Sequence, residues 1–459
     1  MKKRILGISS MAVGILLIFG VNYAWKTLPI ATGYSAKIMC SCVFLSDREK
    51  DAILDTDLSS FDGVDININY LDSTVTAKVM GLAKRTAVFR EGLGCTLALG
   101  ITVEELKSQS VKITKPDSRQ ANNYWPTGEN FAGGEFPAEI DEDALDRALD
   151  KIFLEDDPER LQGTRAAIVV YKGKIVAERY ADGFTKETRL AGWSMTKSIT
   201  NALAGILVQL NLMSLEDDQL FPKWSRDGDP RSKITVDQLL RMSSGLKWEE
   251  VYAGNSDATK MLFTSHSASV VALDKPLEYS PDSVWEYSSG TSNILSELIR
   301  QKVGGDNKQY WNFPHYFLFN KIGMRTAVIE PDASGTFVGS SFMYASARDW
   351  ARFGLLYLND GVWNGDRILP PGWVEYSRTP TPASPNEKYG AHFWRTKGEP
   401  GSTVDMPADA YHLAGYEGQK VVIIPSYDLV MVRLGFSQPE QNWNFTEFVE
   451  NVVSAFPYR

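Results

Sequence analysis

A serine and a lysine three residues apart are the residues in this sequence best placed to do chemistry together. Ser194-Met-Thr-Lys197 opens a long apolar stretch, and at this spacing the two side chains lie one helical turn apart on the same side. A serine hydroxyl is a weak nucleophile until a base removes its proton. A lysine buried at the floor of a cleft loses solvation, so its neutral form can act as that base. The pair predicts nucleophilic catalysis by Ser194, with Lys197 as the partner base.

The predicted position of Ser194 at the start of a helix supports the same chemistry. The first backbone N–H groups of a helix have no intrahelical acceptor, so that of Ser194 can form half of an oxyanion hole. The alternative is that Ser194 only caps the helix and Lys197 lies on the surface. A second S-x-x-K, Ser244-Gly-Leu-Lys247, lies in a predicted turn, where the lysine need not face the serine. We therefore expect no catalysis at Ser244.

Two further stretches carry residues that an acyl-transfer site needs. Tyr287 and Ser289 precede another predicted helix, and a tyrosine near a Ser/Lys pair can pass a proton to the leaving group. His412-Leu-Ala-Gly415-Tyr416 precedes a predicted strand, where a glycine allows close approach and a backbone N–H can be the second oxyanion donor. The ordinary alternatives are core packing for Tyr287 and a hydrogen-bonded structural role for His412, and for His412 we favour the structural role.

The elements that must position these residues indicate an α+β fold. We expect an antiparallel sheet built from both ends of one domain, flanked by N- and C-terminal helices, with a helical subdomain inserted and a β-rich addition before it. The hydrophobic periodicity predicts helices over 141–154, 194–212 and 442–455, a hairpin of 166–171 and 175–180, strands over 421–424 and 429–434, and a helical middle over 215–376. The predicted domains are a signal or anchor over 1–25, a β-rich extension and linker over 26–130, and a hydrolase domain over 131–459.

The N-terminal segment has the composition of an export signal. Residues 1–4 carry three cations, and residues 5–25 carry no charged side chain. The apolar run is long for a cleaved signal peptide and long enough to span a membrane, so we expect an uncleaved anchor or a cleaved signal, and the remaining alternative is a buried helix. The basic start predicts a cytoplasmic N-terminus, which places the body of the protein in the periplasm or at the cell surface.

All three cysteines lie in the first quarter of the chain, at positions 40, 42 and 95. In an oxidising compartment one disulfide and one thiol is the natural count, and Cys95 can pair with either of the others. We favour Cys40–Cys95, and the alternative is that all three are small buried apolar residues.

Composition excludes several classes of protein. The net charge is −9 and the pI about 5.2, which argues against a nucleic-acid partner, since that needs a basic face. There are only 4 histidines, and His266, His315 and His392 show no metal-ligand spacing, so we expect neither a metal nor a cofactor. No G-x-S-x-G elbow is present, which disfavours an α/β-hydrolase.

Taken in chain order, these motifs resemble the serine β-lactamase and penicillin-binding protein superfamily. The match looks best with the class C β-lactamase-like branch, which includes esterases, D,D-peptidases and 6-aminohexanoate-dimer hydrolase, and it covers about 131–459. The resemblance implies that Ser194 is the acylated nucleophile, Lys197 its base, and Tyr287 and Ser289 the second element. Three supporting stretches also look like the family: 235–246, 347–356 and 359–365.

Two departures from the family pattern point away from β-lactams. The Lys-Thr-Gly or His-Thr-Gly element is absent, and His412-Leu-Ala-Gly415 stands in its place. Ser289 stands where β-lactamases carry Asn. Both favour esters or linear amides. The resemblance to the 6-aminohexanoate-dimer hydrolase branch implies that the second oxyanion N–H belongs to Tyr416, and that Tyr252 occupies the position of a substrate-contacting tyrosine.

Three functions remain open at this point. The first is a serine hydrolase that cleaves a small ester or linear amide through a Ser194 acyl-enzyme. The second is a D,D-peptidase or weak β-lactamase acting near the cell wall. The third is a non-catalytic surface sensor with the same fold, which the intact Ser194, Lys197 and Tyr287 argue against. The sequence does not indicate an oligomeric state.

Overall fold

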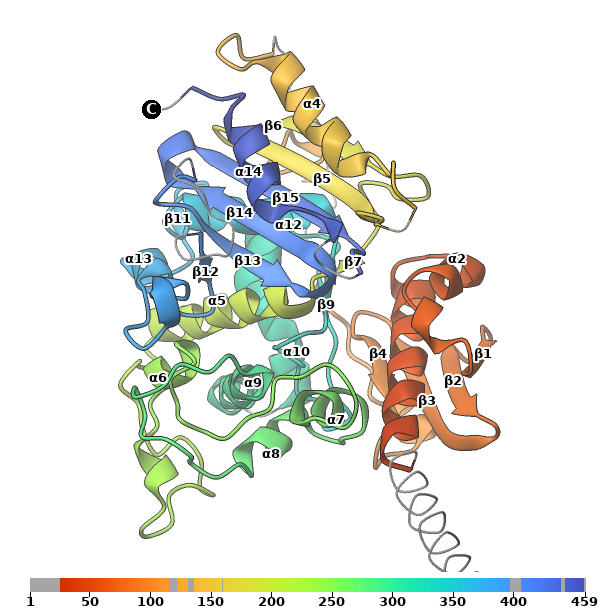
Figure 1. The fold of residues 1–459 in the computed structure, drawn as a ribbon. Helices are drawn as coiled ribbons and strands as arrows, with labels where there is room; N and C mark the ends of the chain where they lie inside the picture. Colours follow the sequence, from red (N-terminus) through yellow and green to blue (C-terminus); the bar gives the residue numbers. More distant parts are fainter. Residues whose placement is uncertain are drawn as a thin grey trace, which may run out of the picture. The chain divides into compact units, whose positions relative to one another are not determined.

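The structure is a computed structural model that describes residues 25–114, 122–130, 136–158, 160–304, 306–396, 406–438 and 442–457. These residues form two compact units (Figure 1). Unit 1 takes the chain up to Gln109 together with Glu249–Ser267 and Asp332–Ser334, and unit 2 takes the rest. Segments from the middle of the sequence therefore complete unit 1.

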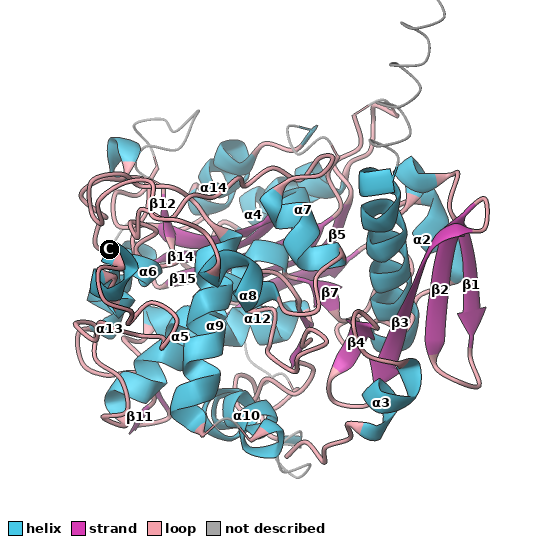
Figure 2. Cartoon of the chain, turned by 90° about the horizontal axis from the view of Figure 1, so that it is seen from below, coloured by secondary structure: helices cyan, strands magenta, loops and turns pink. Residues whose placement is uncertain are grey.

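Unit 1 is an antiparallel sheet with a long helix packed against it (Figure 2). The strands follow the chain in the order β1 (Asp65–Asn69), β2 (Thr74–Val79), β3 (Leu82–Arg90) and β4 (Gly94–Leu97). The short helices are α2 (Lys50–Asp55), α3 (Val103–Ser108) and α7 (Asp257–Phe263). A disulfide joins Cys40 of the long helix to Cys95 of β4, with the Cα atoms 6.0 Å apart, and Cys42 is buried nearby. This is the pairing that the sequence favoured.

The long helix covers Trp25–Leu45, with its last residues Ser41–Leu45 in a π-helical turn. The sequence predicted strands and turns from residue 27 onward, and this is wrong for the helix. From Ile30 to Cys40 nearly every side chain is at least half-buried, so the segment has no polar face and no readable helical period. Further along, the extension is β-rich as predicted, with strands β1 to β4.

Among the described residues, this helix is the one that is long and apolar enough to cross a membrane. The window that meets this test is 72% buried in the structure, as a core helix would be. The segment predicted as the signal or anchor, residues 5–25, lies outside the described residues except for Trp25.

Unit 2 is built on a six-stranded antiparallel sheet that both ends of the domain supply, as predicted. The order is β12 (Trp394–Arg395), β13 (Tyr411–Gly415), β14 (Gln419–Ile424), β15 (Leu429–Gly435), β5 (Thr164–Tyr171) and β6 (Lys174–Tyr180). The hairpin β5–β6 joins the C-terminal strands through β15, with Val430 opposite Val170. All residues of β5, β14 and β15 are buried, as in a sheet covered on both faces.

Helices cover both faces of this sheet. One face packs on α4 (Glu142–Phe153) and α14 (Phe445–Val453), which share a hydrophobic core with Val169, Val422 and Met431. The other face packs on α12 (Ala347–Leu358), where Gly354 lets the helix approach Val430 closely. Beyond α12 lies α5 (Thr196–Gln209), since the Tyr357 hydroxyl donates to Asn201 Oδ1 at 2.6 Å.

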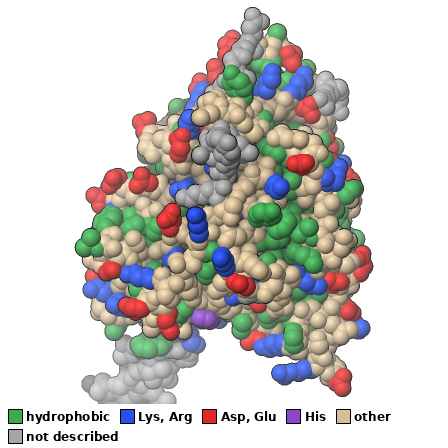
Figure 3. Space-filling model, turned by 180° about the vertical axis from the view of Figure 1, so that it is seen from behind, with side chains coloured by type: hydrophobic (Ala, Val, Ile, Leu, Met, Phe, Trp, Pro, Cys, Tyr) green, Lys and Arg blue, Asp and Glu red, His purple; other side chains and the backbone are tan. Residues whose placement is uncertain are grey.

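The helical subdomain follows α5 in the chain and packs on it through α9 (Ser289–Val303). Its other helices are α6 (Val236–Leu240), α8 (Ala268–Leu273), α10 (Asn307–Pro314), α11 (Asn320–Ile322) and α13 (Trp373–Arg378). The minor strands are β7 (Leu190–Ala191), β8 (Val328–Ile329), β9 (Met343–Ala345), β10 (Val362–Trp363) and β11 (Asp366–Arg367). On the face in Figure 3, acidic and basic side chains of the described residues are interspersed, in keeping with the net charge of −9.

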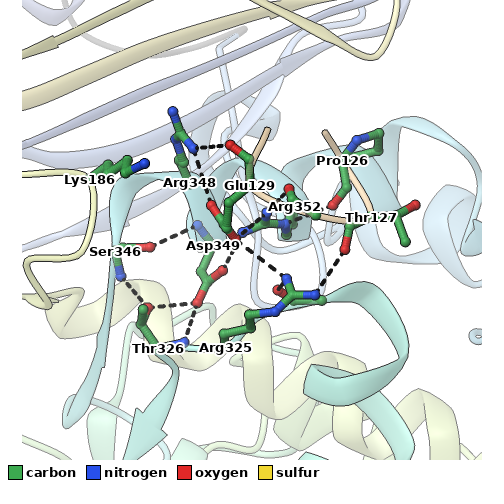
Figure 4. A network of polar contacts seen from close by, with 12 residues as sticks. Pro126, Thr127, Glu129, Lys186, Arg325, Thr326, Ser346, Arg348, Asp349 and Arg352 are labelled. Atoms are coloured by element: carbon green, nitrogen blue, oxygen red, sulfur yellow. Dashed lines mark hydrogen bonds and ion pairs between the residues drawn. The ribbon is translucent and has the colours of Figure 1, made fainter. Parts of the chain in front are cut away.

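A largely buried ionic network holds residues 122–130 against α12 (Figure 4). Arg352 of α12 donates to Asp349 and to Glu129, both at 2.7 Å. Arg348 pairs with Glu129 at 3.2 Å, and Asp349 also accepts from the backbone N–H of Thr326 at 2.7 Å. Residues 122–130, predicted as part of a linker, are therefore fixed to unit 2 by charge-assisted hydrogen bonds.

Candidate active site

The structure brings Ser194 and Lys197 together in unit 2. Lys197 Nζ lies 2.9 Å from Ser194 Oγ, and Lys197 is 1% exposed whereas Ser194 is half-buried. The predicted helix begins slightly later than expected: Trp193–Met195 form a 3-10 turn, and α5 starts at Thr196. The nucleophile candidate thus lies in the turn before the helix, with a buried ammonium directly behind it.

Lys197 is held by two other parts of the chain. Its Nζ donates to Ser289 Oγ at 2.9 Å and to the Ser340 carbonyl at 3.0 Å. Ser289 is placed by the N-terminus of α9, which Ser288 caps by accepting from the backbone N–H of Thr291. With Ser194, these contacts match the three donors of an ammonium. Lys197 therefore has a defined position from which it can exchange a proton with Ser194.

Tyr287 lies against the same lysine. The ring centroid of Tyr287 is 4.8 Å from Lys197 Nζ, and the side chain is half-buried. The second element predicted from the sequence, Tyr287 with Ser289, is thus assembled around Lys197. Ser194, Lys197, Tyr287 and Ser289 come from two helix starts that are far apart in the sequence.

An aromatic cluster lies beside Tyr287, and the sequence analysis did not identify two of its members, Tyr389 and Trp394. Trp394 lies 5.3 Å from Tyr287 and Tyr389 lies 5.8 Å from it, centroid to centroid. Trp285, two residues before Tyr287, packs on Tyr389 at 5.3 Å. Tyr389 and Trp394 carry no motif that would mark them in the sequence. Together they form an apolar wall next to the Ser/Lys pair.

Gly415 and Tyr416 also reach the nucleophile turn. A Cβ on Gly415 would lie 2.1 Å from the Gly192 carbonyl oxygen, so the end of β13 runs directly against the residue two before Ser194. The Tyr416 ring stands edge-on to Trp193 at 5.8 Å, and Tyr416 is 39% exposed. The end of β13 and the turn that carries Ser194 therefore lie directly against each other.

Two left-handed residues link the nucleophile turn to the end of β13. Trp193 has φ +47° and Glu417 has φ +65°, and neither is glycine. The Trp193 indole N–H donates to Glu417 Oε2 at 2.9 Å, with both side chains buried. Positive φ values are unfavourable for residues other than glycine. Because both residues joined by this hydrogen bond adopt them, we infer that the hydrogen bond helps to hold the turn that carries Ser194.

His412 is placed away from this site. It pairs with Val422 across β13 and β14, on the face covered by α4 and α14, and its ring packs on Phe445 at 4.8 Å. Burial, together with the Lys420 ammonium, holds the pKa of His412 well below its usual value. This is the structural placement that the sequence analysis favoured over substrate contact.

The remaining sequence candidates are Tyr252 and the second S-x-x-K. Tyr252 belongs to unit 1, where it is 40% exposed and its hydroxyl donates to Glu250 at 2.6 Å. In the second S-x-x-K, Lys247 pairs with Glu278 at 3.1 Å, and Ser244 Oγ accepts from the backbone N–H of Leu246. The lysine of that pair is thus engaged elsewhere, as its turn context predicted.

A buried histidine supports the floor of the site. His392 Nδ1 lies 2.6 Å from the Leu240 carbonyl, and its Nε2 lies 2.8 Å from Ser292 Oγ on α9. Burial and the nearby Lys197 charge lower the pKa of His392 to about 3, so the ring is neutral.

Within the described ranges no group of three His, Cys, Asp or Glu side chains could hold a metal ion.

One cavity of about 950 Å³ lies on the opposite face of the sheet. It is bounded by α4 and α14, and its lining includes Lys151, Lys420 and Glu447. None of the Ser194 site residues lines it. Its position gives it no part in the chemistry at Ser194.

Comparisons with known proteins agree with this geometry. The Beta-lactamase family model matches residues 159–442. A 6-aminohexanoate-dimer hydrolase of Paenarthrobacter ureafaciens is 24% identical over 295 residues, which cover 59% of this chain and 72% of that protein. A solved structure from Bacillus anthracis, provisionally named as a 6-aminohexanoate-dimer hydrolase, has a TM-score of 0.56 and 21% identity. The match covers 75% of this chain and 88% of that one. The structure of a family VIII carboxylesterase has a TM-score of 0.54 and 14% identity, and the match covers 70% of this chain and 98% of that one.

Proposed function

Since the chain belongs to the Beta-lactamase family, we propose that it is a serine hydrolase that cleaves an ester or a linear amide through an acyl-enzyme on Ser194. The observation that carries the proposal is the buried Lys197 Nζ 2.9 Å from Ser194 Oγ. Burial of Lys197 favours its neutral form, and that form beside the half-buried Ser194 can activate the serine hydroxyl as a nucleophile.

In the proposed reaction Lys197, as its neutral amine, takes the Ser194 proton as Oγ attacks the substrate carbonyl. The backbone N–H groups of Ser194 and Tyr416 stabilise the oxyanion of the tetrahedral intermediate. Tyr287, against Lys197, passes the proton to the departing alcohol or amine as the bond to it breaks. Water then attacks the acyl-enzyme with the same groups acting as its base, which releases the acid and restores the Ser194 hydroxyl.

The choice of esters and linear amides rests on what surrounds Ser194. The strand beside it carries His412-Leu-Ala-Gly415 where β-lactamases carry a Lys-Thr-Gly or His-Thr-Gly element, and His412 faces the other side of the sheet. The wall of Trp285, Tyr389 and Trp394 favours an apolar acyl or leaving group. The names of the relatives, an amide-dimer hydrolase and a carboxylesterase, support the same class.

For its location, we infer an extracytoplasmic enzyme attached to the membrane through its N-terminal segment. The uncharged run of residues 5–25 after a basic start supports this, and so does the Cys40–Cys95 disulfide, which forms stably in an oxidising compartment.

The proposal is tested by covalent labelling of the full chain. A fluorophosphonate probe is expected to label Ser194, as read by peptide mass spectrometry, and hydrolysis of p-nitrophenyl acetate is expected to depend on that residue. Ser194→Ala should abolish both, and Ser244→Ala is the matched control that should change neither. An unlabelled Ser194 together with esterase activity unaffected by Ser194→Ala would refute the proposal. Fast turnover of a chromogenic cephalosporin would instead favour the β-lactamase alternative.

A further prediction concerns the hydrogen bond between Trp193 and Glu417. Glu417→Gly removes the acceptor of the Trp193 indole, but it also relieves the left-handed strain at position 417. These effects on the free energy of unfolding are each about 1 kcal/mol and opposite in sign, so the melting temperature should change little. We expect kcat to fall about tenfold with KM nearly unchanged, because the nucleophile turn loses its fixed position.

The conservative variant distinguishes positioning from general damage. Glu417→Gln keeps an oxygen that can accept from the indole, so it should retain most of kcat. The measurement is a kcat and KM comparison of both variants, with thermal unfolding alongside. Equal kcat for Glu417→Gly and the parent enzyme would show that the bond does not position Ser194.

A further inference from the structure

One end of unit 1 exposes large apolar side chains that the fold does not use. Met80 is 94% exposed, Leu82 is 58% exposed, and Trp25 is 75% exposed. Met80 and Gly81 form the two-residue turn between β2 and β3, since Val79 pairs with Leu82. Both turn residues have positive φ, at 48° and 78°, which favours Asn or Gly at the first position. Met80 thus occupies a strained position and buries nothing within the fold.

The three side chains lie at the same end of unit 1. The Thr32 hydroxyl of the long helix donates to the Ala83 carbonyl at 2.6 Å, which places the start of β3 beside the first half of the helix. At the other end, Phe44 lies 5.9 Å from Tyr70 in the β1–β2 turn. The helix and β3 therefore run in the same direction, and the β2–β3 turn lies toward the end where the helix begins at Trp25 (Figure 1).

The charges near this end suit an anionic surface. Lys26 follows Trp25, and Lys84 and Arg85 follow the turn. The nearby Lys78 is paired with Asp65 at 3.2 Å. Tryptophan at the water boundary with apolar tips and cations beside it is the composition of a membrane interface. In the sequence, Trp25 directly follows the uncharged run of residues 5–24.

We propose that this end of unit 1, made of Trp25, Met80 and Leu82 with Lys26, Lys84 and Arg85, docks on a lipid bilayer that carries anionic headgroups. The inference rests on the proposed membrane attachment and adds a second contact to it. The turn inserts Met80 and Leu82 at the level of the headgroups while the cations meet lipid phosphates. Unit 1 then has a fixed orientation on the membrane, which attachment through the N-terminal segment alone would not give it.

Two labelled positions on the full chain test the docking. Met80→Cys and Leu71→Cys each place one accessible thiol in a β-turn, and Leu71, 100% exposed in the β1–β2 turn at the other end, is the matched control. Each is labelled with the fluorophore NBD and reconstituted into vesicles of phosphatidylcholine and phosphatidylglycerol. We expect a blue-shifted emission at position 80 and reduction by external dithionite about fivefold slower than at position 71.

The outcomes separate docking from attachment. Equal dithionite rates at positions 80 and 71 in protein that sediments with the vesicles would overturn the docking and leave the attachment standing. Protein that does not sediment with the vesicles would overturn both. Protection at position 80 that persists without phosphatidylglycerol would overturn the role of the anionic headgroups. Hydrolase activity enters none of these readouts, so they are independent of the chemistry at Ser194.

Discussion

Replacing Lys197 by methionine is expected to lower kcat/KM for ester hydrolysis by about 10³-fold. Methionine fills a similar volume but cannot accept the Ser194 proton, so the hydroxyl stays protonated and weakly nucleophilic. Lys197 Nζ also contacts Ser289 Oγ and the Ser340 carbonyl, so the side chain is held in position beside Ser194. Fluorophosphonate labelling of Ser194 should be lost in parallel.

The sequence supplies a matched control for this change. Lys247→Met alters the lysine of the second S-x-x-K, which is engaged by Glu278 and exposed. It should leave kcat/KM within about twofold of the parent and the unfolding transition unchanged. Wild-type activity in Lys197→Met, or an equal loss in Lys247→Met, would contradict the assigned base. Circular dichroism of both variants checks that the fold is retained.

Replacing Arg352 by methionine is expected to lower the free energy of unfolding by about 3–5 kcal/mol. Arg352 and Asp349 are each 1% exposed at their side chains and 2.7 Å apart, and Arg352 also pairs with Glu129. Removing the guanidinium leaves the Asp349 carboxylate buried with part of its charge uncompensated. The measurement is chemical unfolding followed by tryptophan fluorescence.

A pair at the surface provides the comparison for Arg352. Arg367 and Asp360 lie 3.4 Å apart with side chains 33% and 58% exposed. Arg367→Met should cost less than about 1 kcal/mol, since solvent screens that pair. Equal costs for the two variants would mean that the network around Glu129 does not anchor residues 122–130 to α12.

Much of the fold of unit 2 was readable from local patterns. The hairpin 166–180 and the strands near 421–434 have strong apolar runs bounded by turn residues, and they pair through β15 and β5 as expected. The long helix of unit 1 was not readable, because a segment buried on most sides presents no polar face from which to derive a period.

The candidate site also has residues that the sequence could place and residues that it could not. Ser194 and Lys197 are three residues apart, so their meeting follows from local geometry at the start of α5. For His412 the sequence favoured a structural role, but it did not show on which face of the sheet the ring lies, because helices cover both faces. Tyr252 lies in a segment that returns to unit 1, a choice made by packing between distant parts of the chain.

The sequence by itself indicated the candidate nucleophile and its base, the flanking motifs and the strands that carry them, because those depend on residues near one another in the chain. Only the tertiary structure decided that Ser289 and the Ser340 carbonyl hold Lys197, that Tyr389 and Trp394 wall the site, and that Glu417 holds Trp193. These contacts join residues dozens to hundreds of positions apart. Their partners are chosen by how helices and strands pack, which no local pattern encodes.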